Sequence, residues 1–499
     1  MEVLYKSTRG NKETITASQA ILQGLSPDGG LYVPTQIPQL CEDLNVLAGL
    51  DYRQLALVIL KKFLTDYTED ELKSCIEKAY GSNFDTEVIA PLVQVRNAYF
   101  LELYHGPTIA FKDMALQILP HLLTTAAKKN GIYDEIVILT ATSGDTGKAA
   151  LAGFADVPGT KIMDFYPDGG VSNIQRLQMV TQKGENTCVV GVKGNFDDCQ
   201  SGVKKMFNDP ALGRLMKEHH MQFSSANSIN IGRLVPQIVY YVWSYLRLVK
   251  YGDIKSGDKI NFVVPTGNFG NILAGYYAKL MGLPVNKLIC ASNDNKVLFD
   301  FFETGIYDKN REFILTVSPS MDILVSSNLE RLIYRICGED EEKNREFMNA
   351  LASDGRYEIT AGMKEMLSDF ECGWADEDED LDVIRRYYEQ EQYVMDTHTG
   401  VAAAVYEKYT EKSGDTSPCV IVSTASPFKF LRAVVKAADP EHVDMLSDYD
   451  LIYRIDEMRN KAGIPQAIKD VLALPIRHKT ICGAQDMEAE VKKFLGLQA

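Results

Sequence analysis

Apolar runs alternate with amphipathic segments along the chain from Ala98 onward, and this pattern defines most of the expected elements. Each short apolar run predicts a buried strand, and the segment after it has apolar residues at helical spacing. The expected strands are EIVILTAT (135–142), KIMDFYP (161–167), TCVVGVKG (187–194), INFVVPT (260–266), KLICASN (287–293) and CVIVST (419–424). Strands that are apolar on both faces and alternate with helices are typical of a parallel sheet covered on both sides. The pattern therefore predicts an α/β fold.

Three segments depart from this alternation. A Gly-rich turn, SPDGGLYVP, and two helical patterns at 52–67 and 69–80 occupy the amino-terminal part, an acidic stretch follows Ser326, and weak helical signals follow Asp444. The acidic runs lack the Gly-kinked spacing of a calcium loop, so we interpret them as solvated faces or loop edges. We expect four regions: an amino-terminal domain at 1–95, an α/β core at 96–325 with a smaller subdomain at about 135–220, a helical acidic insertion at 326–392, and a region at 393–499 that completes the large domain and ends in a helical segment.

Composition narrows the classes of function. The 499 residues are 45% hydrophobic and 24% charged, as is typical of a globular protein with a large core. A net charge of −16 argues against binding to nucleic acid or to an anionic membrane, and no apolar run is long enough to span a bilayer. The nine cysteines are scattered without metal-ligand spacing, so no metal site is expected. The start has no signal-peptide core, and we expect a cytoplasmic protein with reduced cysteines.

Lys112, in the stretch HGPTIAFKDMALQIL, is the first candidate for chemistry. Thr108 is expected to cap a helix, and apolar residues after it recur at helical spacing, so Lys112 is expected in the first turn beside an apolar stripe. The partial positive charge of a helix N-terminus and burial both lower the pKa of a lysine, and a neutral amine can attack an aldehyde. The alternative is a lysine whose stem packs while its ammonium reaches solvent.

A Gly-rich loop follows the strand INFVVPT and leads directly into an expected helix. Glycines free backbone N–H groups to point at a ligand, and the N-terminus of the helix favours an anion. The loop lacks the Gly-x-Gly-x-x-Gly spacing of dinucleotide sites, so it predicts a phosphate cradle, with a purely structural turn as the alternative. The candidate phosphate-binding residues are Gly267, Asn268, Phe269, Gly270 and Asn271.

Two further loops carry polar side chains at the start of expected helices. The stretch TATSGDTGKAA is close to a nucleotide-triphosphate loop but lacks its first glycine and the hydroxyl after the lysine, so an anion site is the remaining expectation. In SSANSINIGRL, hydroxyls, amides and an arginine are placed to hold phosphate or carboxylate, unless they only cap the helix. The candidate residues are Ser143, Asp145, Thr146 and Lys148 in the first loop, and Asn227, Ser228, Asn230 and Arg233 in the second.

The strand CVIVST ends in two hydroxyl residues, Ser423 and Thr424. Such residues at the carboxyl end of a strand face the ligand crevice of an open α/β sheet, although they also cap turns. A reactive lysine, a phosphate cradle, a second anion site and these hydroxyls together match pyridoxal 5'-phosphate. The lysine bonds to the aldehyde of this cofactor, the cradle holds its phosphate, and the second site holds an anionic amino acid.

Eight motifs occur in an order that resembles threonine synthases, which are fold type II (tryptophan-synthase-β-like) pyridoxal-phosphate enzymes: SPDGGLYVP, HGPTIAFKD, ATSGDTG, GNFDDCQ, NSINIGR, PTGNFGN, SPSMDI and STASPFKF. The resemblance covers nearly the whole chain, and the amino-terminal piece and the insertion are similar to the longer subtype. It implies that Lys112 is the cofactor lysine, that Thr424 faces the ring nitrogen, and that Asp145 lies near the ring hydroxyl, where many relatives have Asn. It also implies conversion of O-phospho-L-homoserine and water to L-threonine and phosphate, by γ-elimination and then β-addition.

Two other functions stay open on the sequence. A serine/threonine dehydratase-like lyase of the same fold would need no second phosphate site, and Asn227, Ser228 and Arg233 argue against it. A non-catalytic paralogue that binds phospho-ligands would tolerate loss of Lys112, which this chain retains. The expected partner is a small-molecule substrate, without nucleic acid or membrane, and the expected assembly is a monomer or a homodimer.

Overall fold

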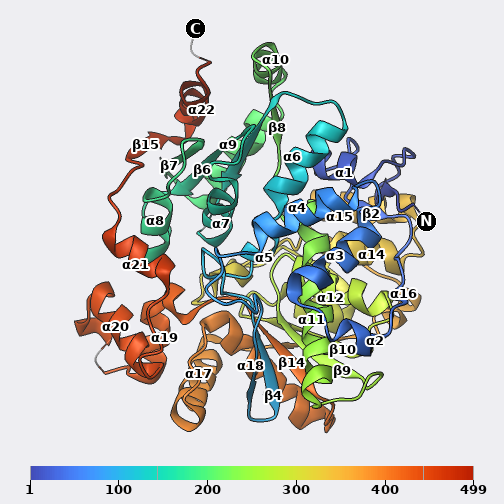
Figure 1. The fold of residues 1–499 in the computed structure, drawn as a ribbon, viewed down its shortest axis with the longest axis vertical. Helices are drawn as coiled ribbons and strands as arrows, with labels where there is room; N and C mark the ends of the chain where they lie inside the picture. Colours follow the sequence, from blue (N-terminus) through green and yellow to red (C-terminus); the bar gives the residue numbers. More distant parts are fainter. Residues whose placement is uncertain (1, 143, 442, 498–499) are drawn as a thin grey trace.

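Two sheets dominate the computed structural model, which describes residues 2–142, 144–441 and 443–497 (Figure 1). The larger sheet has six strands in the order β13-β10-β9-β14-β4-β3, and the smaller has five in the order β15-β7-β6-β5-β8. The neighbouring strands of both sheets pair in parallel, apart from β3 and β4, which form an antiparallel pair. The predicted α/β fold with parallel sheets is confirmed.

The larger sheet is built from apolar strands whose residues alternate between two layers of helices. Its strands are β3 (Leu92–Val95), β4 (Ala98–Glu102), β9 (Ile260–Pro265), β10 (Val285–Ser292), β13 (Phe370–Trp374) and β14 (Cys419–Ser423). Phe262 and Val264 share a core with α11 (Ile231–Tyr251) and α12 (Gly270–Leu280). Val263, between them, shares a core with α17 (Glu377–Glu391) and α18 (Thr397–Ser413). Because both faces are buried, the central strands are continuous apolar runs in the sequence.

The smaller sheet combines strands from the middle of the chain with one from its end. Its strands and the helices between them are β5 (Glu135–Ala141), α7 (Asp145–Phe154), β6 (Thr160–Pro167), α8 (Asn173–Val180), β7 (Thr187–Lys193), α9 (Phe196–Phe207), α10 (Pro210–Glu218) and β8 (Met221–Ser224). β15 (Thr480–Gly483) pairs with β7, and α22 (Met487–Leu495) packs on α9. The region at 393–499 therefore does more than complete the large domain, because its last part extends the smaller sheet. The four-residue strand TICG is too short to signal itself by periodicity.

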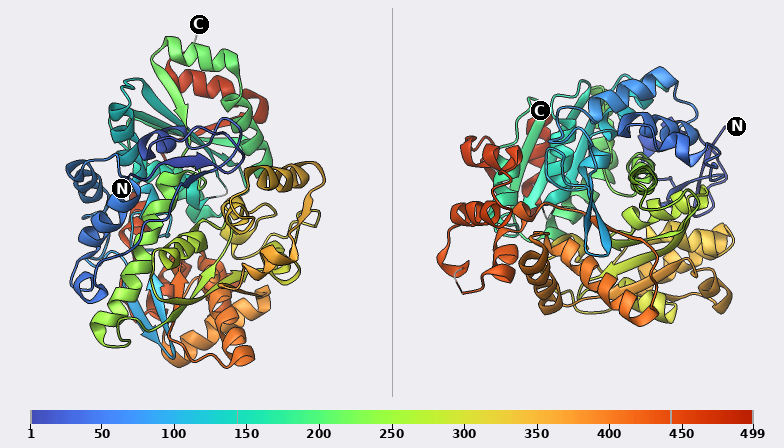
Figure 2. Two further views of the ribbon diagram at one scale, coloured as in Figure 1. Left: turned by 90° about the vertical axis from the view of Figure 1, so that its right-hand side faces the viewer. Right: turned by 60° about the horizontal axis from the view of Figure 1, so that its bottom comes forward.

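Three helices lie between β14 and β15 and pack together. They are α19 (Leu431–Ala438), α20 (Asp448–Met458) and α21 (Gln466–Ala473), and they share a core of their own that includes Leu451, Ile455 and Ile468. α19 also packs on α17. Figure 2 shows this part of the chain, coloured red, on the side of the molecule away from the amino-terminal helices.

The amino-terminal segment forms a helical layer on α6 (Leu119–Lys129) and α11. It contains β1 (Tyr5–Ser7), α1 (Ala17–Gln23), β2 (Tyr32–Pro34), α2 (Leu44–Leu47), α3 (Tyr52–Phe63) and α4 (Glu69–Ala79). Capping boxes at Asp51 with Gln54 and at Thr68 with Glu71 start the two helices that the sequence predicts at 52–67 and 69–80. The boundary expected at residue 95 lies inside the β3–β4 hairpin, so the first strand of the larger sheet precedes it.

The region at 326–392, expected to be helical, also contains strands. Its helices are α14 (Leu329–Ile336), α15 (Glu341–Ser353), α16 (Ala361–Glu365) and α17, and its strands are β12 (Arg356–Glu358) and β13. β12 pairs with β11 (Ile306–Asp308), and β13 is the edge of the larger sheet beside β10. A half-buried edge strand such as FECGW needs no continuous apolar run, so the hydrophobic pattern did not predict it.

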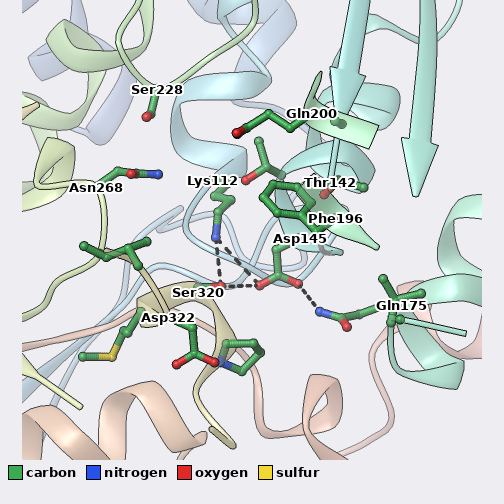
Figure 3. A pocket seen from close by; sticks show the side chains of 18 of the residues that line it. Lys112, Thr142, Asp145, Gln175, Phe196, Gln200, Ser228, Asn268, Ser320 and Asp322 are labelled. Atoms are coloured by element: carbon green, nitrogen blue, oxygen red, sulfur yellow. Dashed lines mark hydrogen bonds and ion pairs between the residues drawn. The ribbon is translucent and has the colours of Figure 1, made fainter. Parts of the chain in front are cut away.

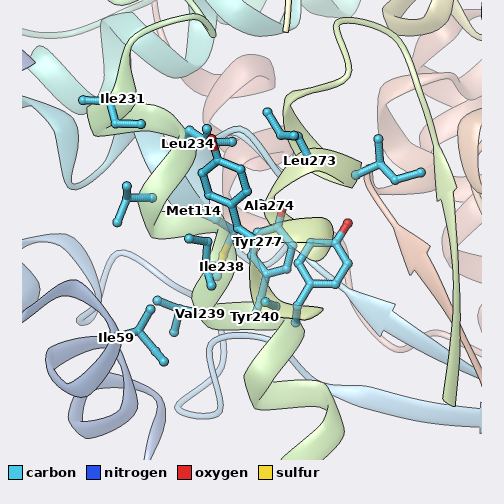
Figure 4. Packing of buried hydrophobic residues seen from close by; sticks show 14 of the residues in the cluster. Ile59, Met114, Ile231, Leu234, Ile238, Val239, Tyr240, Leu273, Ala274 and Tyr277 are labelled. Atoms are coloured by element: carbon cyan, nitrogen blue, oxygen red, sulfur yellow. The ribbon is translucent and has the colours of Figure 1, made fainter. Parts of the chain in front are cut away.

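α11 is the central helix of the molecule, and all residues from Ile231 to Leu248 are buried. Figure 4 shows Ile238 and Val239 of this helix among side chains that include Ile59 of α3 and Met114. Burial on all sides fixes the amino-terminal end of α11, which faces the cavity described below. Although α11 is apolar, the described part of the chain contains no helix that is long and apolar enough to cross a membrane.

Candidate active site

A cavity of about 1730 Å³ lies between the two sheets and is lined by the ends of several strands and helices (Figure 3). Residues after β5, β6, β9 and β14 line it, as do residues at the amino-terminal ends of α7, α11 and α12. These are carboxyl ends of parallel strands, where open α/β sheets bind ligands. The cavity is large enough for a cofactor together with a small substrate.

Lys112 reaches this cavity from the residue before α5 (Asp113–Leu116). Thr108 does not cap that helix as expected, because its N–H and its hydroxyl donate to the two carboxylate oxygens of Asp113, at 2.8 and 2.7 Å. A Cβ atom at Gly106 would lie 2.6 Å from Asp113, so the turn needs glycine there. Thr108 and Asp113 thus hold a tight turn that fixes the backbone of Lys112, and the long predicted helix is broken into α5 and α6.

Burial lowers the pKa of the Lys112 amine to about 8. Asp145 opposes this shift, whereas the cations Lys429 and Arg233 reinforce it. The Nζ atom of Lys112 donates to Ser320 Oγ at 3.3 Å and lies 3.8 Å from Asp145 Oδ2. A lysine with this pKa is partly neutral under mildly alkaline conditions, as a nucleophilic amine must be.

Asp145 is the one carboxylate in direct contact with Lys112 among the described residues. Its Oδ1 accepts hydrogen bonds from Lys429 Nζ at 2.8 Å and from Gln175 Nε2 at 3.0 Å. Its Oδ2 accepts a hydrogen bond from Ser320 Oγ at 3.2 Å. Burial by itself would raise the pKa of Asp145, but Lys429 and Lys112 outweigh that effect and hold the pKa well below its usual range. Asp145 therefore stays an anion that balances two buried lysines.

The loop after β9 approaches the rest of the cavity wall very closely. A Cβ atom at Gly267 would lie 2.4 Å from the carbonyl oxygen of Ser320. Phe269 adopts the left-handed conformation with φ of +62° and turns the chain into α12. Asn328 braces the loop from outside, because its backbone N–H and its side-chain amide both donate to the carbonyl oxygen of Asn268 at 3.0 Å. All five candidate residues of the loop, 267–271, line the cavity.

Asn271, at the start of α12, presents an unpaired donor within this loop. Its Oδ1 accepts hydrogen bonds from Tyr240 and Tyr241, each at 2.7 Å. Its Nδ2 is buried and has no hydrogen-bond partner among the residues that the structure describes. Because the two tyrosines fix the amide orientation, Nδ2 is held as a donor on a residue that lines the cavity.

The residues predicted to form a second anion site lie at the amino-terminal end of α11. Arg233 is buried, lines the cavity and donates from Nη1 to the carbonyl oxygen of Ala226 at 3.0 Å, while its Nε has no partner in the described part of the chain. Asn227 and Ser228 line the cavity beside it. Asn230 does not line it, because this buried residue caps α11 and its amide donates to main-chain oxygens, including that of Ile21 at 2.9 Å. Asn230 therefore shapes the site without facing it.

In the loop after β5, too, some of the candidate residues line the cavity and others do not. Thr146 lines the cavity together with Asp145. Lys148, two residues further along α7, does not line the cavity. Its Nζ donates to Gln182 Oε1 at 2.5 Å. Burial, reinforced by the positive charge of Lys429, lowers the pKa of Lys148 to about 8. Ser143 lies outside the described residues.

The end of β14 distinguishes its two hydroxyl residues. Thr424 lines the cavity, and its hydroxyl has no hydrogen-bond partner within the described ranges. Ser423 does not line the cavity, and its hydroxyl is 2.9 Å from that of Thr399. The main-chain N–H of Phe111, next to Lys112, donates to the carbonyl oxygen of Thr424 at 2.7 Å, which joins this strand end to the lysine.

Four further residues belong to this site that reasoning from the sequence missed. Ser320, His398 and Lys429 line the cavity near Lys112 and Asp145, and Gln175 hydrogen-bonds Asp145. Ser320 and Lys429 lie within the motifs SPSMDI and STASPFKF, which could have drawn attention to them. For His398, the only local signal is the polar string DTHTG at the start of α18.

Family comparisons agree along the chain. A family described as "Threonine synthase N terminus" matches residues 4–80, "Pyridoxal-phosphate dependent enzyme" matches 85–425, and "Threonine synthase, C-terminal" matches 399–494. Human "Threonine synthase-like 1" is 41% identical over 87% of this chain, which spans 59% of the human protein's length. The threonine synthase of Schizosaccharomyces pombe is 38% identical, with 87% of this chain and 89% of the yeast protein covered.

Solved structures give the same result. The crystal structure of threonine synthase from yeast has a TM-score of 0.88 and 34% identity, with 99% of each chain covered. The pyridoxal-phosphate-bound threonine synthase from Brucella melitensis has a TM-score of 0.87 and 35% identity, again with 99% of each chain covered.

The residues of the cavity fit pyridoxal phosphate. Lys112 supplies a buried amine of lowered pKa for the aldehyde. The close approach at Gly267, the amino-terminal end of α12 and the unpaired Asn271 Nδ2 supply donors for the phosphate. Thr424 offers a free hydroxyl on the wall that Lys112 shares. An aldehyde and a phosphate on one small ring match this set of donors.

Proposed function

Because the chain belongs to the threonine synthase family of pyridoxal-phosphate-dependent enzymes, we propose that it converts O-phospho-L-homoserine and water to L-threonine and phosphate. The single observation that carries the proposal is that two separate groups of potential anion donors line the same cavity as Lys112. One site is the loop at 267–271, and the other is formed by Asn227, Ser228 and Arg233. A cofactor phosphate and a substrate phosphate require such a pair of sites.

The phosphate of the cofactor is assigned to the loop at 267–271. This loop lies at the amino-terminal end of α12, where backbone N–H groups and the helix dipole favour an anion. When bound, the cofactor supplies an electron sink for charge that develops on the substrate carbons. Thr424 is assigned to its ring nitrogen, where a hydroxyl forms a hydrogen bond of modest strength, worth about 1 kcal/mol.

The phosphate of the substrate is assigned to Asn227, Ser228 and Arg233. Arg233 lines the cavity, its buried Nε–H has no partner among the described residues, and a charge-assisted hydrogen bond from the guanidinium would stabilise phosphate both bound and departing. Thr146, which also lines the cavity, is assigned a supporting role. Lys148 and Asn230, which the sequence placed among these residues, face away from the cavity and are left out of the proposal.

Lys112 is assigned the proton transfers. Its neutral amine takes the proton from Cα of the substrate, and its position in the cavity lets it return protons as phosphate leaves Cγ and water adds at Cβ. Asp145 holds Lys429 and faces Lys112, so it keeps the charge of the site balanced while the proton moves. The reaction is balanced by one water consumed and one phosphate released. We further propose a cytoplasmic protein that acts as a monomer or homodimer.

The test is to measure both products from the purified protein loaded with pyridoxal phosphate. With O-phospho-L-homoserine, we expect phosphate and L-threonine in equal amounts, measured by a phosphate assay and by amino-acid chromatography. Phosphate with a 2-oxo acid and ammonia would instead assign a dehydratase-like lyase. Binding of the substrate with no product would assign a non-catalytic paralogue. The variant Lys112→Ala is the control for phosphate released without the enzyme's chemistry.

A further inference from the structure

A short turn of the chain brings Ser320 between the two central charges of the site. The turn is η1 (Pro319–Met321), and Ser320 lines the cavity. Its Oγ accepts a hydrogen bond from Lys112 Nζ at 3.3 Å and donates to Asp145 Oδ2 at 3.2 Å, whereas Lys112 and Asp145 are 3.8 Å apart (Figure 3). The hydroxyl therefore takes the place of a direct hydrogen bond between lysine and carboxylate.

His398 holds the backbone of Ser320. The Nε2 atom of His398 accepts the main-chain N–H of Ser320 at 3.0 Å, so this nitrogen carries no proton. The other ring nitrogen, Nδ1, lies 2.7 Å from Asp396 Oδ2, which accepts its proton. Asp396 thereby fixes the tautomer of His398 in which Nε2 can accept the hydrogen bond from the main-chain N–H of Ser320. Both residues are buried.

Asp396 is itself held on both carboxylate oxygens. Oδ2 also accepts the main-chain N–H of His398 at 2.9 Å, and Oδ1 accepts both the main-chain N–H and the hydroxyl of Thr399. These bonds start α18, and the hydroxyl of Thr397 donates to the carbonyl oxygen of Val317, just before the turn, at 2.7 Å. The amino-terminal end of α18 and the turn are thus one hydrogen-bonded unit.

We propose that Ser320 is a further catalytic residue, which separates Lys112 from Asp145 and directs the amine into the cavity, and that Asp396 and His398 are positioning residues for Ser320. This inference rests on the proposed function, because it assigns a role within that reaction. A neutral amine has two N–H bonds and one lone pair. When one N–H of the amine donates to Ser320 Oγ, the lone pair is free to face the substrate. The hydroxyl of Ser320 in turn donates to Asp145, so this carboxylate does not bind the amine directly.

Removal of the hydroxyl leaves Asp145 as the nearest acceptor for Lys112. A direct ion pair would favour the ammonium form, since an adjacent carboxylate stabilises the charged lysine. The other charged groups that act on Lys112 are Lys429 and Arg233, which disfavour the ammonium, and Asp113, which favours it. None of these three is altered by a change at Ser320.

The first test is the reactivity of individual lysines toward acetic anhydride, measured by peptide mass spectrometry on the cofactor-free full chain between pH 6 and 10. In Ser320→Ala, we expect acetylation of Lys112 at pH 7 to fall roughly ten-fold, which corresponds to about one pH unit in the titration of its amine. Lys148 is an internal reference and should be unchanged, since it does not contact Ser320. Ser320→Thr, which keeps the hydroxyl, should restore the reactivity of Lys112. An unchanged titration of Lys112 in Ser320→Ala would overturn the proposal.

The second test separates the positioning residues from a merely structural role. In His398→Gln, an amide oxygen can reach the place of Nε2 and accept Ser320, whereas the shorter side chain of His398→Asn cannot. We expect His398→Gln to keep Lys112 reactivity within about three-fold of wild type and His398→Asn to match Ser320→Ala. Equal effects of the two variants would overturn the role of His398.

The holoenzyme supplies the third readout. Ser320→Ala should lower kcat by roughly ten- to a hundred-fold, the range for a lost hydrogen bond to a charged group, with little change in KM. A rise in KM without loss of kcat would place Ser320 in substrate binding and overturn the proposal. The acetylation test needs neither cofactor nor substrate, so it stands even if the product assay assigns another reaction. In that case the proposed function would fail while the role of Ser320 toward Lys112 is still measured.

Discussion

Lys112 and Lys148 are both lysines with a pKa that burial lowers to about 8, yet they occupy different environments. Lys112 lines the cavity and touches Ser320 and Asp145. Lys148, in α7, lies off the cavity, and its Nζ donates to Gln182 Oε1. Both carry Lys429 as a neighbour that lowers the pKa and Asp113 as one that raises it. Their titration is therefore alike and their access to a ligand is not.

A lowered lysine pKa alone does not identify a nucleophile. Burial produces it wherever an ammonium loses water, whether or not the amine can reach a substrate. What sets Lys112 apart is the turn held by Thr108 and Asp113, which delivers its side chain to the carboxyl ends of the strands. The proposed role of Lys112 therefore rests on this geometry, and the lowered pKa is only compatible with it.

The largest expected difference is between Lys112→Ala and Lys148→Met. Lys112→Ala should lower turnover by about two to four orders of magnitude, because both the covalent attachment of the cofactor and the proton transfer are lost. Borohydride reduction of the wild-type holoenzyme should fix the cofactor on the peptide that contains Lys112, and on no lysine in the variant. Lys148→Met should retain the fixation and most of the turnover. If the cofactor is found on Lys148, the assignment of the two lysines is reversed.

Arg233→Ala should act on Lys112 and leave Lys148 alone. The loss of one charge-assisted hydrogen bond to phosphate should raise KM for O-phospho-L-homoserine by roughly ten- to a hundred-fold. Arg233 also lowers the pKa of Lys112, while it has no such effect on Lys148, so the amine of Lys112 alone should titrate at higher pH in the variant. Acetylation of both lysines against pH measures this, and cofactor content is the control. Loss of cofactor with unchanged KM would move Arg233 to the cofactor site.

Lys429→Met should affect both lysines. Lys429 lowers the pKa of Lys112 and of Lys148, and in the variant Asp145 is left to pair with Lys112. Acetylation at pH 8 should therefore slow by roughly two- to five-fold at both positions, since the loss of a nearby positive charge favours the ammonium. A change confined to Lys148 would mean that Lys112 is insulated from Lys429 by Asp145.

The sequence predicted those parts of the site that follow from one local pattern. A strand that ends in a Gly-rich turn before a helix must place that turn at the ligand edge of the sheet, so the loop at 267–271 could be recognised before its geometry was known. The end of the strand CVIVST indicated Ser423 and Thr424 together, and only the family resemblance selected Thr424 and the role of Lys112. The fold class followed from apolar strands that alternate with helices, because burial on both faces leaves no other pattern.

The parts that the sequence missed depend on the direction of single side chains or on contacts between distant segments. Asn230 and Lys148 lie in the correct loops, but one caps α11 and the other points away from the cavity, which spacing alone cannot reveal. His398 acts through Ser320, which is far away in sequence, and Lys429 reaches Asp145 across the cavity. The strands β13 and β15 are short edge strands without an apolar run, so only tertiary pairing defines them.

The smallest expected effect is a shared dependence of stability on pH. For both lysines, the pKa in the folded protein is about 8, below the ordinary value of 10.5, so the unfolded chain binds more protons between these pH values. The destabilisation from each lysine is therefore fully present below pH 8 and lost as pH rises to 10.5. Lys148→Met removes this pH-dependent destabilisation. It also leaves the side chain of Gln182 without the hydrogen bond from Lys148, which lowers stability by about 1 kcal/mol at every pH.

Only the pH-dependent part tests the comparison between the two lysines. Calorimetry should give the difference in the free energy of unfolding between Lys148→Met and wild type at pH 7 and at pH 10. We expect this difference to favour the variant by about 0.5–2 kcal/mol more at pH 7 than at pH 10. Lys112→Met should show a gain of the same sign, although it is inactive and Lys148→Met is active. A difference between variant and wild type that is constant with pH would mean that the lysine in question titrates normally. If the two lysines show the same pH-dependent effect on stability while only Lys112 is needed for activity, access to the cavity is the property that separates them.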